Sequence, residues 1–242
     1  MSTQVLPVPD ARPAKPSATS ALVRRGRGRP PLTRDEAQAV RDRIQAAAAQ
    51  VFAQHGYHGV SVELILQACG VSRPTFYRYF RNTDEVINLV LQDVNDSLIR
   101  EVTLAVRTAD GPLQKVESGL LAWRHWGERQ GPLLKAVFAE MHDTHSPAAA
   151  HRQRVLEALA RELNEAVTSL GREPFDPLQV ETFVIGVEYL GYRFHFGPDG
   201  PTEESWQRTR DAMVRLALGM LGGALEWAHA PQLAGVLGLR VR

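Results

Sequence analysis

Apolar residues at helical spacing, punctuated by glycine and proline, most strongly constrain the fold of this 242-residue chain. They recur every three or four positions from Thr33 to about residue 230, a spacing that places them on one face of a helix. A half-buried strand needs an apolar residue at every second position, and no stretch shows this alternation convincingly. We therefore predict an all-α fold, with helices over residues 34–55, 61–68, 73–80, 83–108, 112–129, 132–142, 147–170, 176–196 and 202–230.

Two of the predicted helices are short and adjacent. Ser61 and Ser72 are suited to cap their N-termini, and Gly70 supplies the turn between them. The residues expected to face the interior are Leu64, Ile65, Ala68, Phe76 and Phe80. Two short helices joined by a glycine-containing turn form a helix-turn-helix.

Charge is distributed unevenly along the chain. Residues 1–82 contain 12 Lys and Arg against 5 Asp and Glu, whereas residues 83–242 contain 16 against 22. A basic first third joined to an acidic remainder favours nucleic acid as the partner of the first third. The second short helix offers guanidinium groups, hydroxyls and a ring, which contact bases and phosphates in a major groove; these residues are Ser72, Arg73, Pro74, Thr75, Tyr77 and Arg78. The alternative is that the two helices only complete a core.

The stretch from Ala47 to Leu91 resembles the N-terminal domain of the TetR/AcrR family of transcriptional regulators. The matching features are Gly56 at the end of the first helix, the helix starts Gly59-Val60-Ser61 and Gly70-Val71-Ser72, and the run Thr75-Phe76-Tyr77-Arg78-Tyr79-Phe80. The resemblance implies a three-helix DNA-binding domain followed by a helical bundle that binds a ligand and dimerises. Such a homodimer, most often a repressor in this family, would bind a palindromic operator in double-stranded DNA and leave it when a small apolar or amphipathic effector binds.

The resemblance also implies particular DNA contacts. The residues that would face bases are Arg73, Pro74, Thr75 and Arg78, and those that would face phosphates are Tyr77 and Tyr79. Ser61 would bind a phosphate through its hydroxyl and the helix N-terminus. The family usually has a phosphate-binding lysine at the position of Thr83, and Arg81 is expected to replace it.

Residues 1–33 are expected to form a flexible arm, because they carry six of the fifteen prolines and show no apolar periodicity. The RGRP sequence of the arm resembles the core of an AT-hook; its candidate DNA contacts are Arg25, Arg27, Gly28 and Arg29. Gly28 would leave room in a narrow minor groove, whose negative potential attracts the arginines. A solvated basic tail is the alternative. Residues 34–82 would then form the DNA-binding domain, 83–230 the ligand-binding and dimerisation domain, and 231–242 a tail.

Aromatic and polar residues in the C-terminal part indicate a small-molecule site of unknown specificity. They would line a cavity between helices or, alternatively, form the core. The candidate ligand-binding residues are Trp123, Trp126, Phe138, Met141, His142, Phe183, Glu188 and Tyr192. The last two predicted helices are apolar on more than one face, which favours covering by a second copy of the chain. The candidate dimer contacts are Val187, Leu190, Phe194, Val214, Leu218, Leu221 and Leu225.

Other classes of protein are disfavoured. The single cysteine, Cys69, cannot build a disulfide framework or a thiolate zinc site, and the spacing of His142, His145 and His151 fits no metal signature. No phosphate loop, nucleophile elbow or suitably spaced carboxylate pair supports catalysis, so we expect neither an enzyme nor a cofactor. No apolar run is long enough to span a membrane, and the N-terminus lacks the apolar core of a signal peptide, which predicts a cytoplasmic protein. The remaining alternatives are a regulator or activator without an effector and, more weakly, an enzyme on a helical scaffold.

Overall fold

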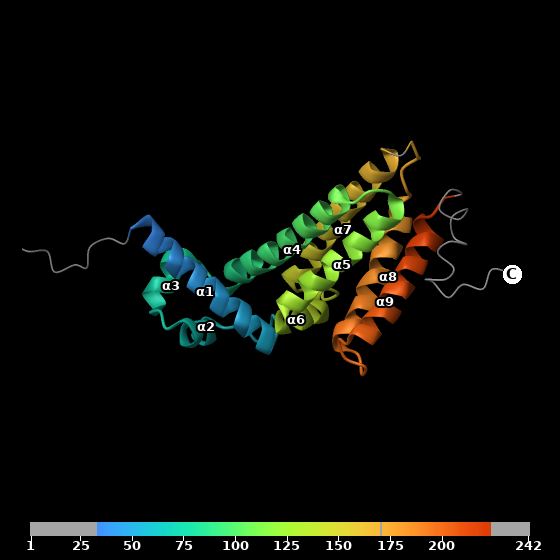
Figure 1. The fold of residues 1–242 in the computed structure, drawn as a ribbon. Coiled ribbons are helices and arrows are strands. Elements are labelled where there is room, and N and C mark those ends of the chain that lie inside the picture. Colours follow the sequence, from blue (N-terminus) through green and yellow to red (C-terminus); the bar gives the residue numbers. More distant parts are fainter. Residues whose placement is uncertain (1–32, 170, 224–242) are drawn as a thin grey trace, which may run out of the picture.

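The computed structural model describes residues 33–169 and 171–223, and all regular secondary structure in these ranges is helical, as predicted (Figure 1). The helices are α1 (Arg34–His55), α2 (Val62–Cys69), α3 (Arg73–Tyr79), α4 (Thr83–Thr108), α5 (Pro112–Gln130), α6 (Pro132–Glu140), α7 (Pro147–Thr168), α8 (Pro177–Phe196) and α9 (Glu203–Leu221). Within the described ranges, no helix is both long and apolar enough to cross a membrane.

Local capping signals determine where the first four helices begin. Each capping side chain accepts a hydrogen bond from the backbone N–H three residues later; the caps are Thr33, Ser61, Ser72 and Asn82. At α1 the box is reciprocal, because the Glu36 carboxylate accepts the Thr33 N–H at 2.8 Å. Gly70 ends α2 in the left-handed region at φ 66°, which gives glycine an advantage at this turn.

The first three helices enclose a small core together with the start of α4. Its fully buried side chains include Ile44, Phe52, Ile65, Phe76 and Ile87. The prediction that Ala68 faces this core is wrong, since Ala68 is exposed and Cys69 is buried instead. The reason is helical geometry, because Cys69 lies one turn after Ile65 and therefore shares its face.

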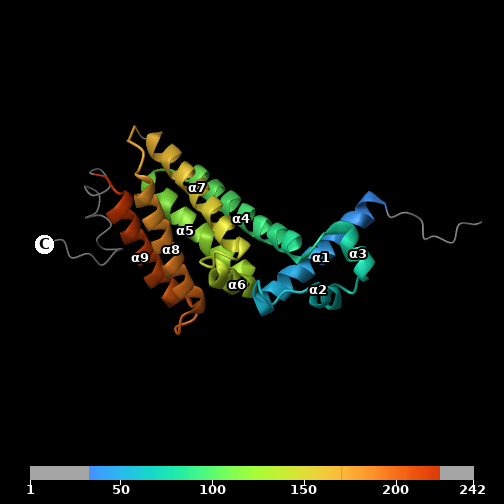
Figure 2. The same ribbon diagram turned by 180° about the vertical axis from the view of Figure 1, so that it is seen from behind.

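Helix α4 connects the two parts of the chain (Figures 1 and 2). Its 26 residues span about 39 Å at 1.5 Å per residue. It contacts α1 of the N-terminal part and packs along α5 and α7 of the C-terminal bundle. Helices α8 and α9 pack on each other at the side of the bundle away from α4, as both views show.

Helix α9 ends earlier than predicted. It stops at Leu221, and Gly222 is extended with φ −68° and ψ 133°. Two successive glycines, Gly222 and Gly223, disfavour continuation, because glycine costs about 1 kcal/mol relative to alanine in a helix. The rest of the predicted helix, residues 224–230, lies outside the described residues.

Candidate nucleic-acid interface and ligand cavity

Helix α3 presents a polar, basic surface on one side and an apolar side to the core. Phe76 is fully buried and its ring lies 5.9 Å from that of Phe80, which anchors the helix. Arg73, Tyr77 and Arg78 are exposed. The helix is therefore held by its aromatic side while its guanidinium groups face solvent.

The residues around α3 are partly organised by contacts with one another. The Ser72 and Thr75 hydroxyls lie 2.8 Å apart, and Ser72 Oγ also accepts the Thr75 N–H. Arg73 forms an ion pair with Glu63 of α2. Both partners are more than half exposed, so water screens this pair and an incoming phosphate can compete with Glu63.

The other predicted DNA contacts lie near this surface or outside the described residues. Ser61 caps α2 by accepting the Leu64 N–H, and its O–H can still donate to a phosphate. Pro74 and Arg81 are exposed, and Tyr79 is half-buried. The candidate contacts of the arm, Arg25, Arg27, Gly28 and Arg29, lie outside the described residues, as does Leu225 of the dimer set.

The C-terminal bundle encloses a cavity of about 690 Å³. Helices α4, α5, α7, α8 and α9 all contribute to its walls, which are mostly aliphatic and aromatic. Of the residues predicted to bind a ligand, the cavity is lined by Trp123, Phe183 and Glu188.

The remaining predicted ligand residues are placed differently. Trp126, Phe138 and Met141 line a second space of about 50 Å³, too small for a drug-sized ligand. Tyr192 is exposed, with its ring 5.6 Å from that of Phe138. His142 is exposed and lines neither space.

Polar groups occur at intervals along the large cavity. Glu188 forms an ion pair with Arg152 at 2.8 Å, and both side chains are less than a fifth exposed. Lys115 donates to the carbonyls of Val106 and Ala109, at the C-terminal end of α4. The Thr103 hydroxyl is buried and has no hydrogen-bond partner among the described residues. Sequence reasoning missed Thr103 and Lys115, because nothing in their spacing distinguishes them from surface residues.

Most residues predicted to form a dimer contact point into the protomer. Those that line the cavity are Val187, Val214, Leu218 and Leu221. Phe194 is 1% exposed and packs edge-on against Trp206, while Leu190 is half-buried. The apolar side chains that α8 exposes are instead Leu178, Ile185, Tyr189 and Tyr192. A helix that is apolar on several faces does not reveal from its sequence which face the bundle covers.

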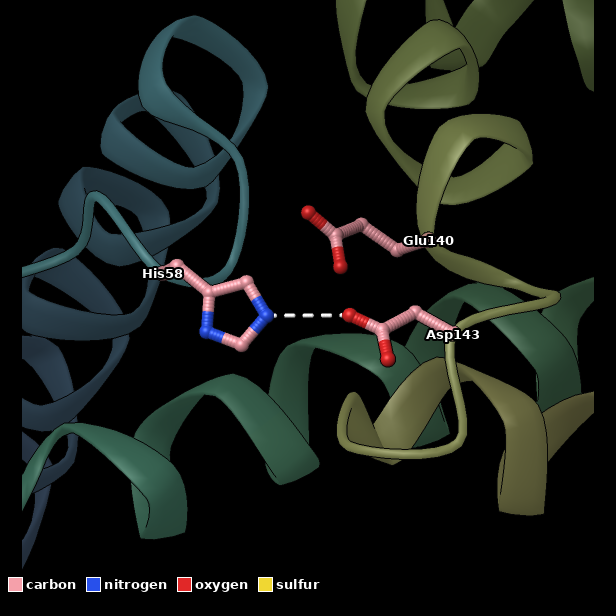
Figure 3. A group of neighbouring side chains, drawn as sticks. All are labelled: His58, Glu140 and Asp143. Carbon is pink, nitrogen blue, oxygen red and sulfur yellow. Dashed lines mark hydrogen bonds and ion pairs between the residues drawn. The ribbon is translucent and has the colours of Figure 1, made fainter.

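The N-terminal part meets the bundle where the turn after α1 reaches the end of α6 (Figure 3). The Tyr57 N–H donates to Glu140 Oε1 at 2.9 Å, and His58 Nε2 lies 2.9 Å from Asp143 Oδ2. The hydrogen bond from His58, followed by that from the His145 N–H, lowers the pKa of Asp143 to about 2. Asp143 is therefore ionised at neutral pH.

The three histidines weighed in the sequence do not converge. His142 and His145 are exposed, and only His145 contacts Asp143. His151 is buried, with its ring nitrogens near Asn88 and Arg154, and burial lowers its pKa to about 4. The partner that sequence reasoning missed is His58, which lies 85 residues before Asp143.

Comparison with known proteins agrees with this architecture. Residues 44–90 match the family of bacterial regulatory proteins called the tetR family. The chain is 25% identical over 201 residues to the HTH-type transcriptional activator FasR of Mycolicibacterium smegmatis, covering 83% of this chain and 87% of FasR. It is 27% identical over 151 residues to the HTH-type transcriptional regulator UidR of Escherichia coli K12, covering 55% of this chain and 76% of UidR.

A solved structure shares the fold over most of the described chain. It is a TetR family transcription regulator from Marinobacter aquaeolei VT8, with a TM-score of 0.62 at 19% identity, covering 76% of this chain and 98% of that chain. The helix-turn-helix, the family match over residues 44–90 and the named relatives agree with the resemblance seen in the sequence. Residues 44–90 are a DNA-binding domain of the tetR family, and the chain is a DNA-binding transcriptional regulator similar to proteins of that family.

Proposed function

We propose that the chain is a homodimeric repressor that leaves a palindromic operator when an elongated apolar or amphipathic molecule enters the cavity of the bundle. The observation that carries this proposal is the cavity itself. Its 690 Å³ falls within the range of about 300–1,000 Å³ typical of small-molecule sites, and its walls are mostly apolar.

The length of the cavity supports an extended ligand. Residues Val155 to Val167 of α7 line it, and this stretch rises about 18 Å at 1.5 Å per residue. Lys115 supplies a cationic group on its wall, at the C-terminal end of α4. A straight apolar chain with one polar end matches this combination better than a compact polar molecule, which would leave its own polar groups unpaired.

Helix α4 provides a direct route from the cavity to the DNA-binding helices. Leu98, Val102 and Val106 line the cavity, whereas Ile87, about three turns or more earlier, belongs to the core shared with α1. A ligand that displaces the C-terminal half of α4 therefore acts on the same rigid element that supports the N-terminal part. To favour release, the ligand must bind the released state more tightly, by a coupling free energy of typically 1–3 kcal/mol.

The exposed face of α8 is our candidate for the dimer interface. Ile185, Tyr189 and Tyr192 are each at least 40% exposed. Aromatic residues are enriched in protein interfaces, and a two-fold axis would bring this patch against its own copy. Two copies of α3 would then read two half-sites about 34–36 Å apart. The basic arm would add minor-groove and phosphate contacts.

The test has a DNA stage and a ligand stage. Selection of genomic fragments by the purified full-length chain is expected to yield a palindromic site, and straight-chain fatty acids of increasing length then serve as ligand probes. Release from the operator that depends on chain length supports the proposal. Equal affinity of every probe that binds the cavity for free and operator-bound protein would refute effector-driven release.

A second candidate is activation of transcription, because FasR is named as an activator and aligns with most of this chain. A reporter gene placed behind the selected operator distinguishes the two signs. Repression predicts that expression falls when the chain is present, and activation predicts that it rises.

A further inference from the structure

We propose that His58, Glu140 and Asp143 form a binding site for a divalent transition-metal ion, with Zn²⁺ as the best-matched ion. Each residue offers one ligand atom, and these atoms all lie within 4.8 Å of one another (Figure 3). This proposal does not depend on the effector or on the sign of regulation, because the cluster lies outside the cavity lining.

The present spacing is close to that of an occupied tetrahedral site. Zinc binds His nitrogen and carboxylate oxygen at about 2.0–2.1 Å, which places the ligand atoms about 3.3 Å apart. His58 Nε2 and Asp143 Oδ2 are 2.9 Å apart, so this contact must open slightly. No ligand atom in the group needs to approach another by more than about 1.5 Å, within reach of small side-chain rotations.

Backbone hydrogen bonds already orient both carboxylates. Glu140 Oε1 accepts the Tyr57 N–H at 2.9 Å, and Asp143 Oδ1 accepts the His145 N–H at 2.8 Å. In each case one oxygen is held by the backbone and the carboxylate has a second oxygen to offer. Such outer contacts fix the ligands of metal sites, and their loss typically costs 10–100-fold in metal affinity.

The donor set selects the class of ion. One imidazole and two carboxylates suit Zn²⁺ and neighbouring transition metals, whereas Ca²⁺ takes six to eight oxygen ligands and Mg²⁺ near-ideal octahedral oxygen coordination. With three protein ligands, the fourth position is left for water. The stability order of divalent metals places Zn²⁺ above Mn²⁺ and Fe²⁺ and below Cu²⁺ at such a site, and the four-coordinate geometry favours Zn²⁺ over Cu²⁺, which prefers tetragonal coordination.

The ion would join the two parts of the molecule. His58 lies in the turn after α1, whereas Glu140 ends α6 and Asp143 follows it. Besides the packing of α1 on α6, this junction holds hydrogen bonds and an ion pair in which the His58 side chain is 65% exposed. A bound ion would stabilise the relative placement of α1 and α6 seen here.

The primary experiment measures zinc binding to the full-length chain, freed of any purification tag and treated with chelator. Competition with a chromophoric zinc chelator is expected to show one ion per chain. At a free zinc concentration about a hundredfold above the dissociation constant, Tm should rise by about 5–10 °C. Absence of binding, or binding without a change in Tm, would overturn the proposal.

Nearly isosteric variants locate the ion. Glu140→Gln keeps an acceptor for the Tyr57 N–H, and Asp143→Asn and His58→Gln remove the other two ligands. Each should lose the zinc-dependent rise in Tm, while His125→Gln, which removes an exposed histidine on α5, should keep it. Retention of wild-type zinc affinity by the three site variants would assign the ion elsewhere and refute the site.

A site variant that does not fold without metal could not be tested in this way, so a spectroscopic measurement on the wild-type chain provides a second test. Co²⁺ bound to the wild-type chain in a four-coordinate site gives strong visible absorption, which an octahedral surface ion does not. The expected result is a strong visible band that zinc displaces one for one. A weak octahedral spectrum would contradict the proposed coordination, whatever the variants show.

Discussion

Replacing Gly191 of α8 by alanine tests the close approach of α5 and α8 beside the cavity. A Cβ at position 191 would lie 1.7 Å from Trp123 Cη2 and 2.4 Å from its Cζ3. Carbon atoms pack at about 3.5–4.0 Å, so the indole edge must retreat by about 2 Å. The Trp123 ring must therefore change position, although it is buried and forms part of the cavity wall.

Overpacking of this kind costs about 1–3 kcal/mol, and a contact this short belongs at the upper end. The higher helix propensity of alanine stabilises the folded chain by about 1 kcal/mol and offsets part of this cost. We therefore expect Gly191→Ala to lower the free energy of unfolding by about 2 kcal/mol and Tm by about 4–8 °C. Denaturant unfolding followed by far-UV circular dichroism measures the change.

Two further variants separate the clash from a general effect of alanine. Gly219→Ala on α9 has no atom within 4 Å of its added Cβ and should raise stability by about 0.5–1 kcal/mol. Trp123→Leu should relieve the clash, so that Gly191→Ala costs less in its presence. If Gly191→Ala stabilises the chain as Gly219→Ala does, the close packing inferred here is wrong.

Three more predictions concern DNA binding, the cavity and pH. Arg78→Ala is tested by salt-titrated operator binding. If Arg78 contacts a base, the variant should weaken binding by about 1–3 kcal/mol, and if it contacts a phosphate, the variant should lower the log–log salt slope by about 1. Replacing the exposed Arg100 of α4 by alanine should change neither quantity. Thr103→Val should raise the free energy of unfolding without ligand by about 1–3 kcal/mol, because it removes a buried hydroxyl that has no hydrogen-bond partner among the described residues. Denaturant titration measures the change, and a loss of stability would contradict the prediction. The pKa of His151 is lowered to about 4 in the folded chain, so as pH falls below 6.5 His151 is protonated in the unfolded chain before it is protonated in the folded one. Between pH 7 and 5 the wild type should therefore lose about 2 kcal/mol more unfolding free energy than His151→Gln. Equal losses would refute the lowered pKa of His151.

The helix starts could be predicted because their signals are local. Thr33 with Glu36, and Ser72 with Thr75, satisfy backbone N–H groups within four residues, so the sequence alone contains both partners. Phe76 could be placed in the core for the same reason, since its helical period is visible in a short window. The DNA contacts assigned to α3 stay predictions.

The relative placement of distant elements could not be predicted. His58 and Asp143 are 85 residues apart in the sequence, and Glu188 and Arg152, which form an ion pair, are 36 residues apart. Such pairs depend on how α1, α6, α7 and α8 pack, which no spacing rule contains. The dimer set failed to identify an exposed surface for a related reason, because α8 is apolar toward both the cavity and solvent.

Helix α8 has apolar residues on both its cavity side and its solvent side, and this affects how a ligand would act. Phe183 and Val187 line the cavity, whereas Ile185 and Tyr189 are exposed on the other side of the helix. In the proposed dimer, ligand and partner chain would therefore contact opposite faces of one helix. A ligand that shifts α8 would then change the angle between the two copies directly, in addition to any movement of α4. Because half-site spacing depends on that angle, the two routes would act on operator affinity together, and variants of the exposed face would alter the ligand response without touching the ligand.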